Sequence, residues 1–361
     1  MNNNNRQDNK GREQKDQELQ VIKLGIDLHA RQVTFSRQVD QRVPQPAQRM
    51  HPRAFVQWVR EQQTPGLKIY SCYEAGACGY WLHRELEKVG VKNFVIAPQP
   101  MDQGASRQKT DRLDAAVLVD QLDRYLRGNH KVFSVVAVPS EQQEQQRALT
   151  RLHRQLLGDR LRAEARGRAL LCSQGIEVGG CWWKTKNWKL LSNGLLASWM
   201  LETLQSWRAK ILDLDKEQNR LRQRIEALAQ ASDLPKGAGR YSWVVLQSEM
   251  RSWERFNNPG QVSSYTGLCP GVHNSNGRGH EGRINRCGNK TVRYTLIEML
   301  WRMVRWQPHY GPIRQLVKGL LSKRAKRRVA VAAARRLAVD LWRLATGRTT
   351  AEKLGLIMQK H

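Results

Sequence analysis

Long hydrophobic runs and paired cysteines are both absent from this sequence. No stretch of about 18 or more apolar residues occurs, so a membrane-spanning helix is not expected. None of the six cysteines forms a Cys-x-x-Cys pair, which argues against a zinc ribbon and against a disulfide scaffold. They are Cys72, Cys78, Cys172, Cys181, Cys269 and Cys287. Thiols spaced in this way suit a reducing prokaryotic cytoplasm.

Acidic residues are scarce relative to basic ones. The 361-residue chain has 61 Lys and Arg against 32 Asp and Glu, which gives a formal net charge of +29. Such an excess favours a polyanionic partner, because each neutralised phosphate releases condensed counterions. A ribosomal protein or a protein that binds anionic membranes would share this property, so charge indicates a class of partner and not an activity.

The first 20 residues, MNNNNRQDNKGREQKDQELQ, are polar and lack the apolar core of a signal peptide. They predict a disordered basic leader, residues 1–20. Residues 21–138 then alternate between strand and helix patterns. Strands are predicted over residues 21–28, 31–39, 67–74, 93–98 and 131–138, and helices over residues 52–62, 79–90 and 111–127. Two early strands followed by alternating helices and strands predict a mixed α/β sheet covered by helices.

Residues 139–232 are rich in Gln, Arg, Glu and Leu, with helical spacing of the apolar residues. We expect a long helical hairpin or coiled coil, with Leu214, Leu221, Ile225 and Leu228 in a stripe on the second helix. The segment either sets the oligomeric state, or holds nucleic acid, or separates two domains. Between the helices, Trp182, Trp183 and Trp188 could stack on bases, but packing inside the helical hairpin is the favoured interpretation.

Residues 233–361 predict a mainly helical C-terminal domain. A Gly-x-Gly turn at residues 237–239 precedes a helix and can present backbone N–H groups to a phosphate. Residues 319–348 predict a strongly basic helix. Its basic residues either form a solvated face or, as the net charge favours, bind nucleic acid. They are Lys323, Arg324, Lys326, Arg327 and Arg328.

Four carboxylates come from three separate segments of the first region. Asp27 and Glu74 each end a predicted strand, whereas Asp111 and Asp114 lie on the same side of a predicted helix. Taken singly, each is explained as a turn, cap or first-turn acid. Gathered at one sheet edge, the four would repel one another unless divalent cations neutralised them. Magnesium or manganese, bridged by carboxylates and phosphate oxygens, meets that need.

The segments that carry these acids resemble a known family. GIDLHA (residues 25–30), YEAG (73–76) and KTDRLDA (109–115) are similar to DEDD-type transposases of bacterial insertion sequences. A downstream stretch, residues 255–308, is similar to their C-terminal domain. The resemblance favours the insertion-sequence 110 family and its 1111-like branch, and it covers residues 20–135 and 233–345. It implies an RNase H-like fold, similar to Holliday-junction resolvases, for residues 21–138 and a transposase domain for residues 233–361.

The resemblance also implies a serine nucleophile in the C-terminal domain. The family carries a Ser-Ser-Gly stretch where this chain reads Asn274-Ser275-Asn276-Gly277, so Ser275 is the hydroxyl left at that place. Ser263 and Ser264 lie on a predicted helix and are assigned a structural role. A serine nucleophile needs activation or a metal-assisted leaving group, which the acids would provide. The family further implies an element-encoded bridge RNA that guides recombination, and a homo-oligomer, dimer or tetramer.

A glycine-rich stretch follows Ser275. Residues 277–282 form a Gly-x-Gly-x-x-Gly motif, but no apolar strand precedes it, so a dinucleotide site is not expected. A loop is predicted instead, in which glycines let Arg278, Arg283 and Arg286 approach a DNA phosphate. Lys109, beside the acid pair, belongs to the same predicted nucleic-acid surface. His280 is interpreted as a phosphate contact or a surface residue rather than as an acid/base group.

Together these features predict a DNA transposase or recombinase that acts in the cytoplasm, on the nucleoid. One alternative is a metal-dependent junction endonuclease without serine chemistry, whose Ser275→Ala variant would retain cleavage. Another is a non-catalytic nucleic-acid-binding protein, in which Asp27→Ala would change no activity.

Overall fold

The computed structural model describes residues 20–98, 111–229, 234–275, 278–317 and 322–359. The chain divides into two compact units, Met1–Val138 (unit 1) and Pro139–His361 (unit 2), and each is described by itself. Among the helices described in both units, none is long and apolar enough to cross a membrane.

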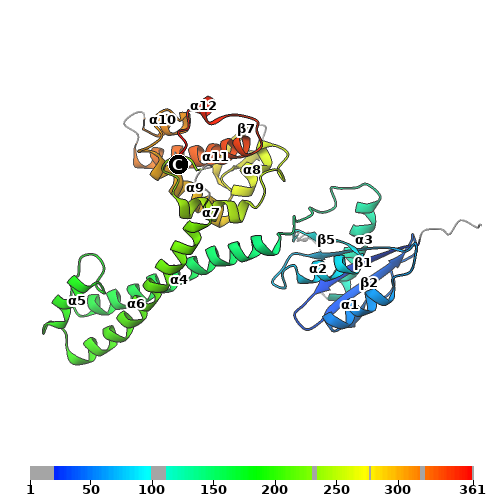
Figure 1. The fold of residues 1–361 in the computed structure, drawn as a ribbon, viewed down its shortest axis with the longest axis horizontal. Helices are drawn as coiled ribbons and strands as arrows, with labels where there is room; N and C mark the ends of the chain where they lie inside the picture. Colours follow the sequence, from blue (N-terminus) through cyan, green and yellow to red (C-terminus); the bar gives the residue numbers. More distant parts are fainter. Residues whose placement is uncertain (1–19, 99–110, 230–233, 276–277, 318–321, 360–361) are drawn as a thin grey trace, which may run out of the picture. The chain divides into compact units, whose positions relative to one another are not determined.

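Unit 1 contains a mixed five-stranded sheet (Figure 1). Its strands are β1 (Val21–Leu28), β2 (Val33–Val39), β3 (Gln48–Met50), β4 (Lys68–Glu74) and β5 (Lys92–Ile96), in the order β3-β2-β1-β4-β5. The first three strands pair antiparallel, whereas β1, β4 and β5 pair parallel. The mixed α/β architecture predicted from the sequence is therefore confirmed.

Helices cover both faces of this sheet because side chains alternate along each strand. Ile22, Leu24 and Ile26 of β1 face one side, where they share a core with α1 (Pro52–Glu61) and α2 (Trp81–Lys88). The opposite face carries α3 (Asp111–Leu126), whose Leu118 and Leu122 are buried against Cys72, Ile96 and Phe133. Residues of β1 with odd numbers, including Asp27, therefore lie on the α3 side.

One predicted strand of unit 1 is wrong. Residues 131–138 pair with the sheet only through an isolated bridge between Ile96 and Val135. Their apolar side chains are used for packing instead, since Phe133 is buried under α3 and Val136 and Val138 cover the other core. A high content of valine favours extended backbone, but it does not by itself supply a strand partner.

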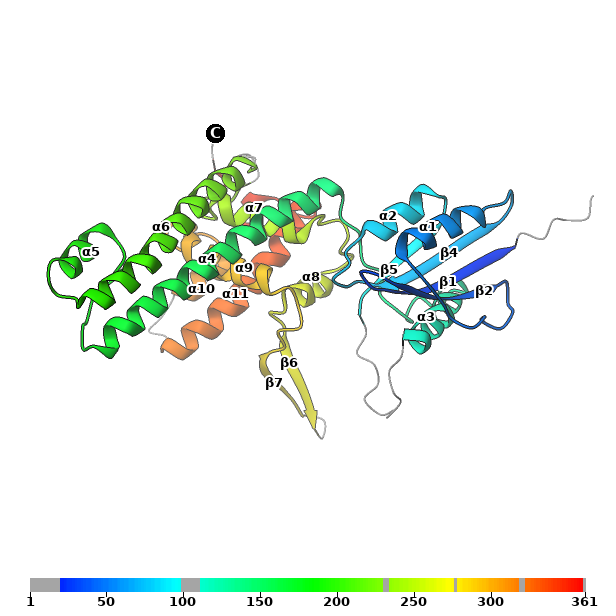
Figure 2. The same ribbon diagram turned by 90° about the horizontal axis from the view of Figure 1, so that it is seen from below.

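Unit 2 begins with two long helices that lie side by side, α4 (Glu141–Ser173) and α6 (Ser198–Ala227), with α5 (Thr185–Ser192) between them in the chain (Figures 1 and 2). Ser140 starts α4 with a capping box to Gln143. Trp182 is fully buried against Gly167, where a Cβ would lie 2.1 Å from the indole. Trp183 is also buried, so the packing interpretation of these rings is confirmed.

The apolar stripe of the second long helix is only partly as predicted. Leu221 and Ile225 are buried, whereas Leu228, which follows the last residue of α6, is 43% exposed.

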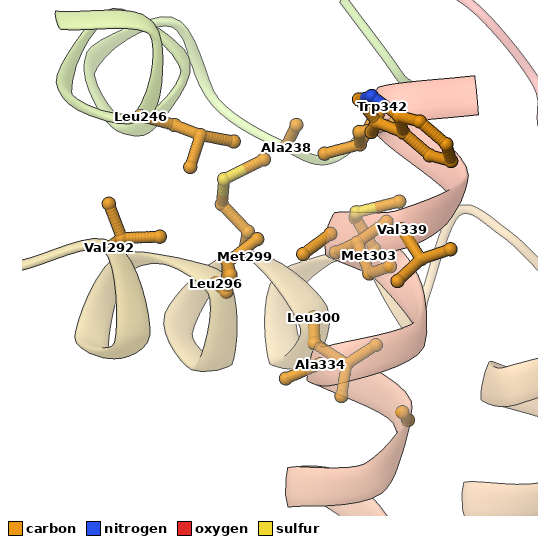
Figure 3. Packing of buried hydrophobic residues seen from close by; sticks show 14 of the residues in the cluster. Ala238, Leu246, Val292, Leu296, Met299, Leu300, Met303, Ala334, Val339 and Trp342 are labelled. Carbon is orange, nitrogen blue, oxygen red and sulfur yellow. The ribbon is translucent and has the colours of Figure 1, made fainter. Parts of the chain in front are cut away.

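The rest of unit 2 is mainly helical, as predicted. Its helices are α7 (Arg240–Met250), α8 (Pro259–Thr266), α9 (Lys290–Met303), α10 (Gly311–Val317), α11 (Lys323–Ala345) and α12 (Ala351–Leu354). Figure 3 shows the core, where Met303 of α9 lies beside Val339 of α11 and Met299 of α9 points towards Leu246 of α7.

The glycine-rich stretch of unit 2 is not the loop that the sequence predicts. It forms an antiparallel hairpin of β6 (Pro270–Ser275) and β7 (Arg278–Ile284). Its residues are mostly small or polar, so the pattern of alternating apolar residues that marks a strand is missing. The backbone hydrogen bonds of the ladder, rather than side-chain burial, define this element.

Candidate active site

The packing of α3 on β1 decides where the predicted acids lie. A Cβ on Gly25 would lie 2.3 Å from Val119 N and 2.4 Å from Ala115 O, so the helix backbone rests directly on this glycine. Two residues earlier on the same face, Lys23 Nζ contacts Asp123 Oδ1. Moving along β1 from Lys23 to Gly25 thus corresponds to moving backwards along α3, and the two elements run antiparallel.

Asp27 consequently lies level with the beginning of α3. Two residues of a strand span about 6.6 Å, which is about the length of four residues of a helix. Going from Gly25 to Asp27 along β1 therefore reaches the turn of α3 that contains Asp114. Asp27 keeps 23% of its side chain exposed, and His29 Nε2 lies 3.2 Å from its Oδ2. The sequence interpretation did not include His29, although it stands two positions after Asp27 in the same motif.

Glu74 occupies the neighbouring position on the next parallel strand. The register pairs Ile26 with Tyr73, so Asp27 and Glu74 come directly afterwards at the carboxyl edge. Glu74 is exposed, and it lies on the same face as Cys72, whose Sγ donates to Leu118 O of α3 at 3.3 Å. Burial and, secondarily, the charge of Glu74 raise the pKa of the Cys72 thiol, as expected for a carboxylate on this face.

Asp114 is half-buried, one position before the Ala115 carbonyl that rests on Gly25. Asp111 is the first residue of α3, but its side chain is not among those that the structure describes. We call these four residues, Asp27, Glu74, Asp111 and Asp114, the acid edge. Among the described side chains, no three His, Cys, Asp or Glu residues gather closely enough to hold a metal ion. The oxygen donors nevertheless suit a hard divalent cation, and their metal role stays a prediction.

The predicted nucleophile lies at the tip of the β6–β7 hairpin, which we call the serine hairpin. Ser275 is the last residue of β6 and pairs with Arg278, and His273 pairs with His280. Figure 2 shows the hairpin projecting from the helices of its unit. The side chains of residues 272–283 are outside the described set, so Ser275, Arg278, His280 and Arg283 are located by their backbone alone, and Gly277 falls outside the described residues.

The base of the serine hairpin is held between α8 and α9. Asn285 N donates to Cys269 O at 2.9 Å, and Asn289 N donates to Tyr265 O at 2.7 Å. A Cβ on Gly288 would lie 2.3 Å from Gly267 N, so the two ends of the hairpin touch through glycines. Gly267 ends α8 in the left-handed conformation, with a φ of 65°. Ser263 and Ser264 lie on α8.

Comparisons with known proteins match both regions. A family model for DEDD transposases, described as "Transposase", matches residues 24–174, and the model described as "Transposase IS116/IS110/IS902 family" matches residues 235–312. The "Putative transposase y4rJ" of Sinorhizobium fredii is 30% identical over 298 residues, which are 75% of each chain. The chain belongs to the IS116/IS110/IS902 family of transposases. It is therefore an enzyme of transposition that acts on DNA.

Two further relatives extend the match. The "Probable family 20 transposase" of Pseudomonas aeruginosa is 26% identical over 354 residues, covering 92% of this chain and 98% of the relative. The "Transposase for insertion sequence element IS1111A" of Coxiella burnetii is 24% identical over 299 residues, covering 79% and 80%. DEDD transposases generally depend on a divalent metal ion, so membership in the family supports the coarse expectation of metal dependence.

Most of the basic residues predicted on α11 are exposed to solvent. Arg324, Lys326, Arg327 and Arg328 are exposed on the first turns of α11. Lys326 Nζ also lies 5.9 Å from the centre of the Trp301 ring. Lys109 and the side chain of Lys323 fall outside the described part of the chain.

Arg286 lies at the base of the serine hairpin. It is exposed and has a φ of 59°, and its carbonyl accepts a hydrogen bond from Arg293. The predicted contact between Arg286 and a phosphate remains a prediction.

Proposed function

We propose that this transposase cleaves and rejoins element and target DNA through a serine nucleophile, Ser275, together with magnesium or manganese held by the acid edge. The observation that supports the metal role is the close packing of α3 on Gly25. It turns the first turns of that helix towards the carboxyl ends of β1 and β4, which supports a common site for acids from three sequence segments. Carboxylates on one edge need a counter-charge, which a divalent cation supplies.

Each residue has a defined task in this reaction. The Ser275 hydroxyl attacks a DNA phosphorus and loses its proton, and the bond from phosphorus to a deoxyribose oxygen breaks as that oxygen takes up a proton. The product is a phosphoserine link, which a hydroxyl of another strand later attacks to restore the serine. A bound metal ion would supply charge stabilisation at the phosphate. His29 can donate a hydrogen bond to Asp27 and so orient one of its carboxylate oxygens.

The basic residues carry the nucleic-acid contacts of the proposal. Arg278, Arg283 and Arg286 follow Ser275 and would hold the phosphates around the cleaved bond, while Lys109 would do so near the acid edge. The cations on α11, Lys323 to Arg328, would bind the backbone at a second place. An element-encoded structured RNA guides the choice of DNA, and the transposase acts as a dimer or tetramer. The large positive charge of the chain supports a partner of this kind.

Trapping of the covalent link tests the proposal. Element-end DNA labelled on one strand is incubated with the transposase, the flanking RNA of the element and magnesium, and the products are denatured and resolved by size. We expect a protein–DNA adduct that Ser275→Ala abolishes, whereas Ser264→Ala, at an exposed serine on α8, retains it. Omission of the RNA should remove site-specific adducts.

The same experiment separates the alternatives. Cleavage by Ser275→Ala without an adduct in either protein would favour a junction endonuclease that uses the acids alone. Unchanged activity of Asp27→Ala would contradict the metal role of the acid edge.

A further inference from the structure

A buried carboxylate in α7 holds together the base of the serine hairpin. Glu249 is fully buried, and its side chain accepts hydrogen bonds from Arg147 at 3.0 Å, Arg151 at 3.1 Å and Asn289 at 2.8 Å. Burial alone would raise its pKa, but the hydrogen bonds from Arg151, Arg147 and Asn289 outweigh burial and hold the pKa below its ordinary value. The carboxylate is therefore charged and paired at neutral pH.

The partners of Glu249 include both ends of the hairpin. Tyr265, near the end of α8, donates its hydroxyl to Glu249 O at 2.8 Å. Asn289, at the start of α9, donates to the Glu249 carboxylate at 2.8 Å and to the Tyr265 hydroxyl at 3.2 Å. The chain enters the hairpin after Tyr265 and leaves it before Asn289. We call these residues, Glu249, Arg147, Arg151, Tyr265 and Asn289, the Glu249 network.

The network also fixes the helices that flank the hairpin. The Asn289 side chain caps α9 by accepting from Thr291 N at 2.9 Å. Arg154, on the same helix α4 as the two arginines, donates to Thr291 Oγ1 at 2.6 Å. The Arg255 guanidinium covers the Tyr265 ring at 4.3 Å from its centre. Four helices, α4, α7, α8 and α9, thus meet through polar contacts at one place in unit 2.

Stability alone gives little reason for such an arrangement. Replacing a buried ion pair with apolar residues of similar volume is often neutral or stabilising, because desolvation offsets the attraction of the charges. Hydrogen bonds are directional, so they fix the relative orientation of the groups that they join better than apolar packing does. At the base of a projecting hairpin, orientation determines where the tip lies.

The geometry of the hairpin makes its tip sensitive to its base. From Cys269 to Ser275 an extended strand spans about 20 Å, at about 3.3 Å per residue. A tilt of about 3° at the base therefore displaces the tip by about 1 Å. A displacement of that size can slow a positioned reaction by about 100-fold.

We propose that Glu249 is a positioning residue for strand transfer, which holds the base of the serine hairpin through Tyr265 and Asn289 so that Ser275 meets the phosphate in an attacking geometry. This role depends on Ser275 being the nucleophile. It is distinct from any contact with DNA, because the Glu249 side chain is fully buried.

Two mild variants test this role without emptying the buried site. Tyr265→Phe removes the hydroxyl that joins α8 to Glu249, and Asn289→Ser keeps a good cap for α9 but removes the amide donor. We expect each variant to slow adduct formation by at least about tenfold under single-turnover conditions. Affinity for element-end DNA with its RNA should stay within about twofold of the native value, since no DNA-contacting group is changed.

Matched controls separate positioning from a general loss of stability. Tyr310→Phe removes a phenol donor that is more deeply buried than Tyr265 and that bonds Asp340 at 3.0 Å in the core of the same unit. Asn258→Ser makes the same exchange at the cap of α8, where the side chain accepts from Gln261 N. In urea unfolding, each control should lose about as much stability as the test variant with which it is matched. Both controls should form the adduct at the native rate.

Three results would overturn the role of Glu249. Native rates in both Tyr265→Phe and Asn289→Ser would do so, as would equal slowing by Tyr310→Phe. In either case the native protein still forms the adduct, so the serine chemistry stands. The absence of any adduct from the native protein would remove the proposed nucleophile and, with it, the positioning role.

Discussion

The acid edge and the serine hairpin are held in position by different physical means. The acid edge rests on a direct contact between two backbones, because Gly25 lets α3 lie against β1, and its four acids belong to β1, β4 and α3. The serine hairpin has few apolar side chains, and its base is held by hydrogen bonds to a buried charge. The backbone contact at Gly25 depends on a single residue, whereas the base of the hairpin depends on several separate hydrogen bonds. We therefore expect one substitution at Gly25 to displace the whole helix α3 in unit 1. In unit 2, loss of a single hydrogen bond at the base of the hairpin should lower the reaction rate only in part.

The largest expected effect is chemical and concerns Asp114. Asp114→Asn should lower DNA cleavage by about 10³-fold, because a lost metal ligand removes several kcal/mol of charge stabilisation. Thermal stability should be unchanged or slightly higher, since the substitution removes a half-buried charge and keeps the shape of the side chain. Asp120→Asn is the control, as this acid lies on the same helix with 63% of its side chain exposed. Cleavage at the native rate by Asp114→Asn would exclude Asp114 as a metal ligand.

The second largest effect is expected from a substitution that disrupts the packing of α3 on β1. In Gly25→Ala the new methyl group would meet the backbone of Val119 and Ala115, which cannot move aside as a flexible side chain could. We expect a loss of about 3 kcal/mol in the free energy of unfolding, measured with urea, and a loss of cleavage even where the protein remains folded. Gly311→Ala is the control, because no atom lies within 4 Å of its added Cβ. Equal stability of the two variants would show that α3 does not depend on this close approach.

The sequence predicts the strands that carry the acid edge better than the strands of the serine hairpin, and the reason is physical. Strands β1 and β4 are buried, so their apolar residues mark both the strands and the acids that end them. A glycine inside such a strand is also a signal of close backbone approach. The hairpin carries little apolar content, so its ladder leaves no periodic pattern. The strand predicted over residues 131–138 fails for the opposite reason, since Phe133 and the valines pack well without a partner strand.

The Glu249 network shows what a sequence does not display. Arg147 lies 102 positions before Glu249 in the chain, Tyr265 lies 16 positions after it, and Asn289 lies 40 positions after it. No local pattern joins such residues. The sequence does show an acid within the largely apolar segment WVVLQSEM, which indicates a buried charge. It does not show which residues pair with that charge.

A smaller effect concerns pH and should appear in unit 2. Because the folded pKa of Glu249 is lowered, the stability that its charge contributes is present above the ordinary glutamate value of about 4.3 and is lost as the pH falls through the lower folded value. Glu249→Gln should be less stable than the native protein near neutral pH, and the difference should shrink under acid. Urea midpoints at about pH 7 and about pH 3, the second well below the ordinary glutamate value, measure it. A difference that grows under acid would mean that the Glu249 pKa is raised rather than lowered.

The smallest expected effect separates DNA affinity from both catalytic regions. Lys326→Gln on α11 should weaken DNA binding uniformly across sequences and reduce the slope of log affinity against log salt by about 1, because one phosphate contact is lost. At saturating DNA the rate of adduct formation should equal that of the native protein, unlike the result for Asp114→Asn or Tyr265→Phe. Arg220→Gln is the control, since its side chain is 71% exposed on α6. A salt slope unchanged from the native value would place Lys326 outside the DNA-binding surface and leave its charge as a solvated face beside Trp301.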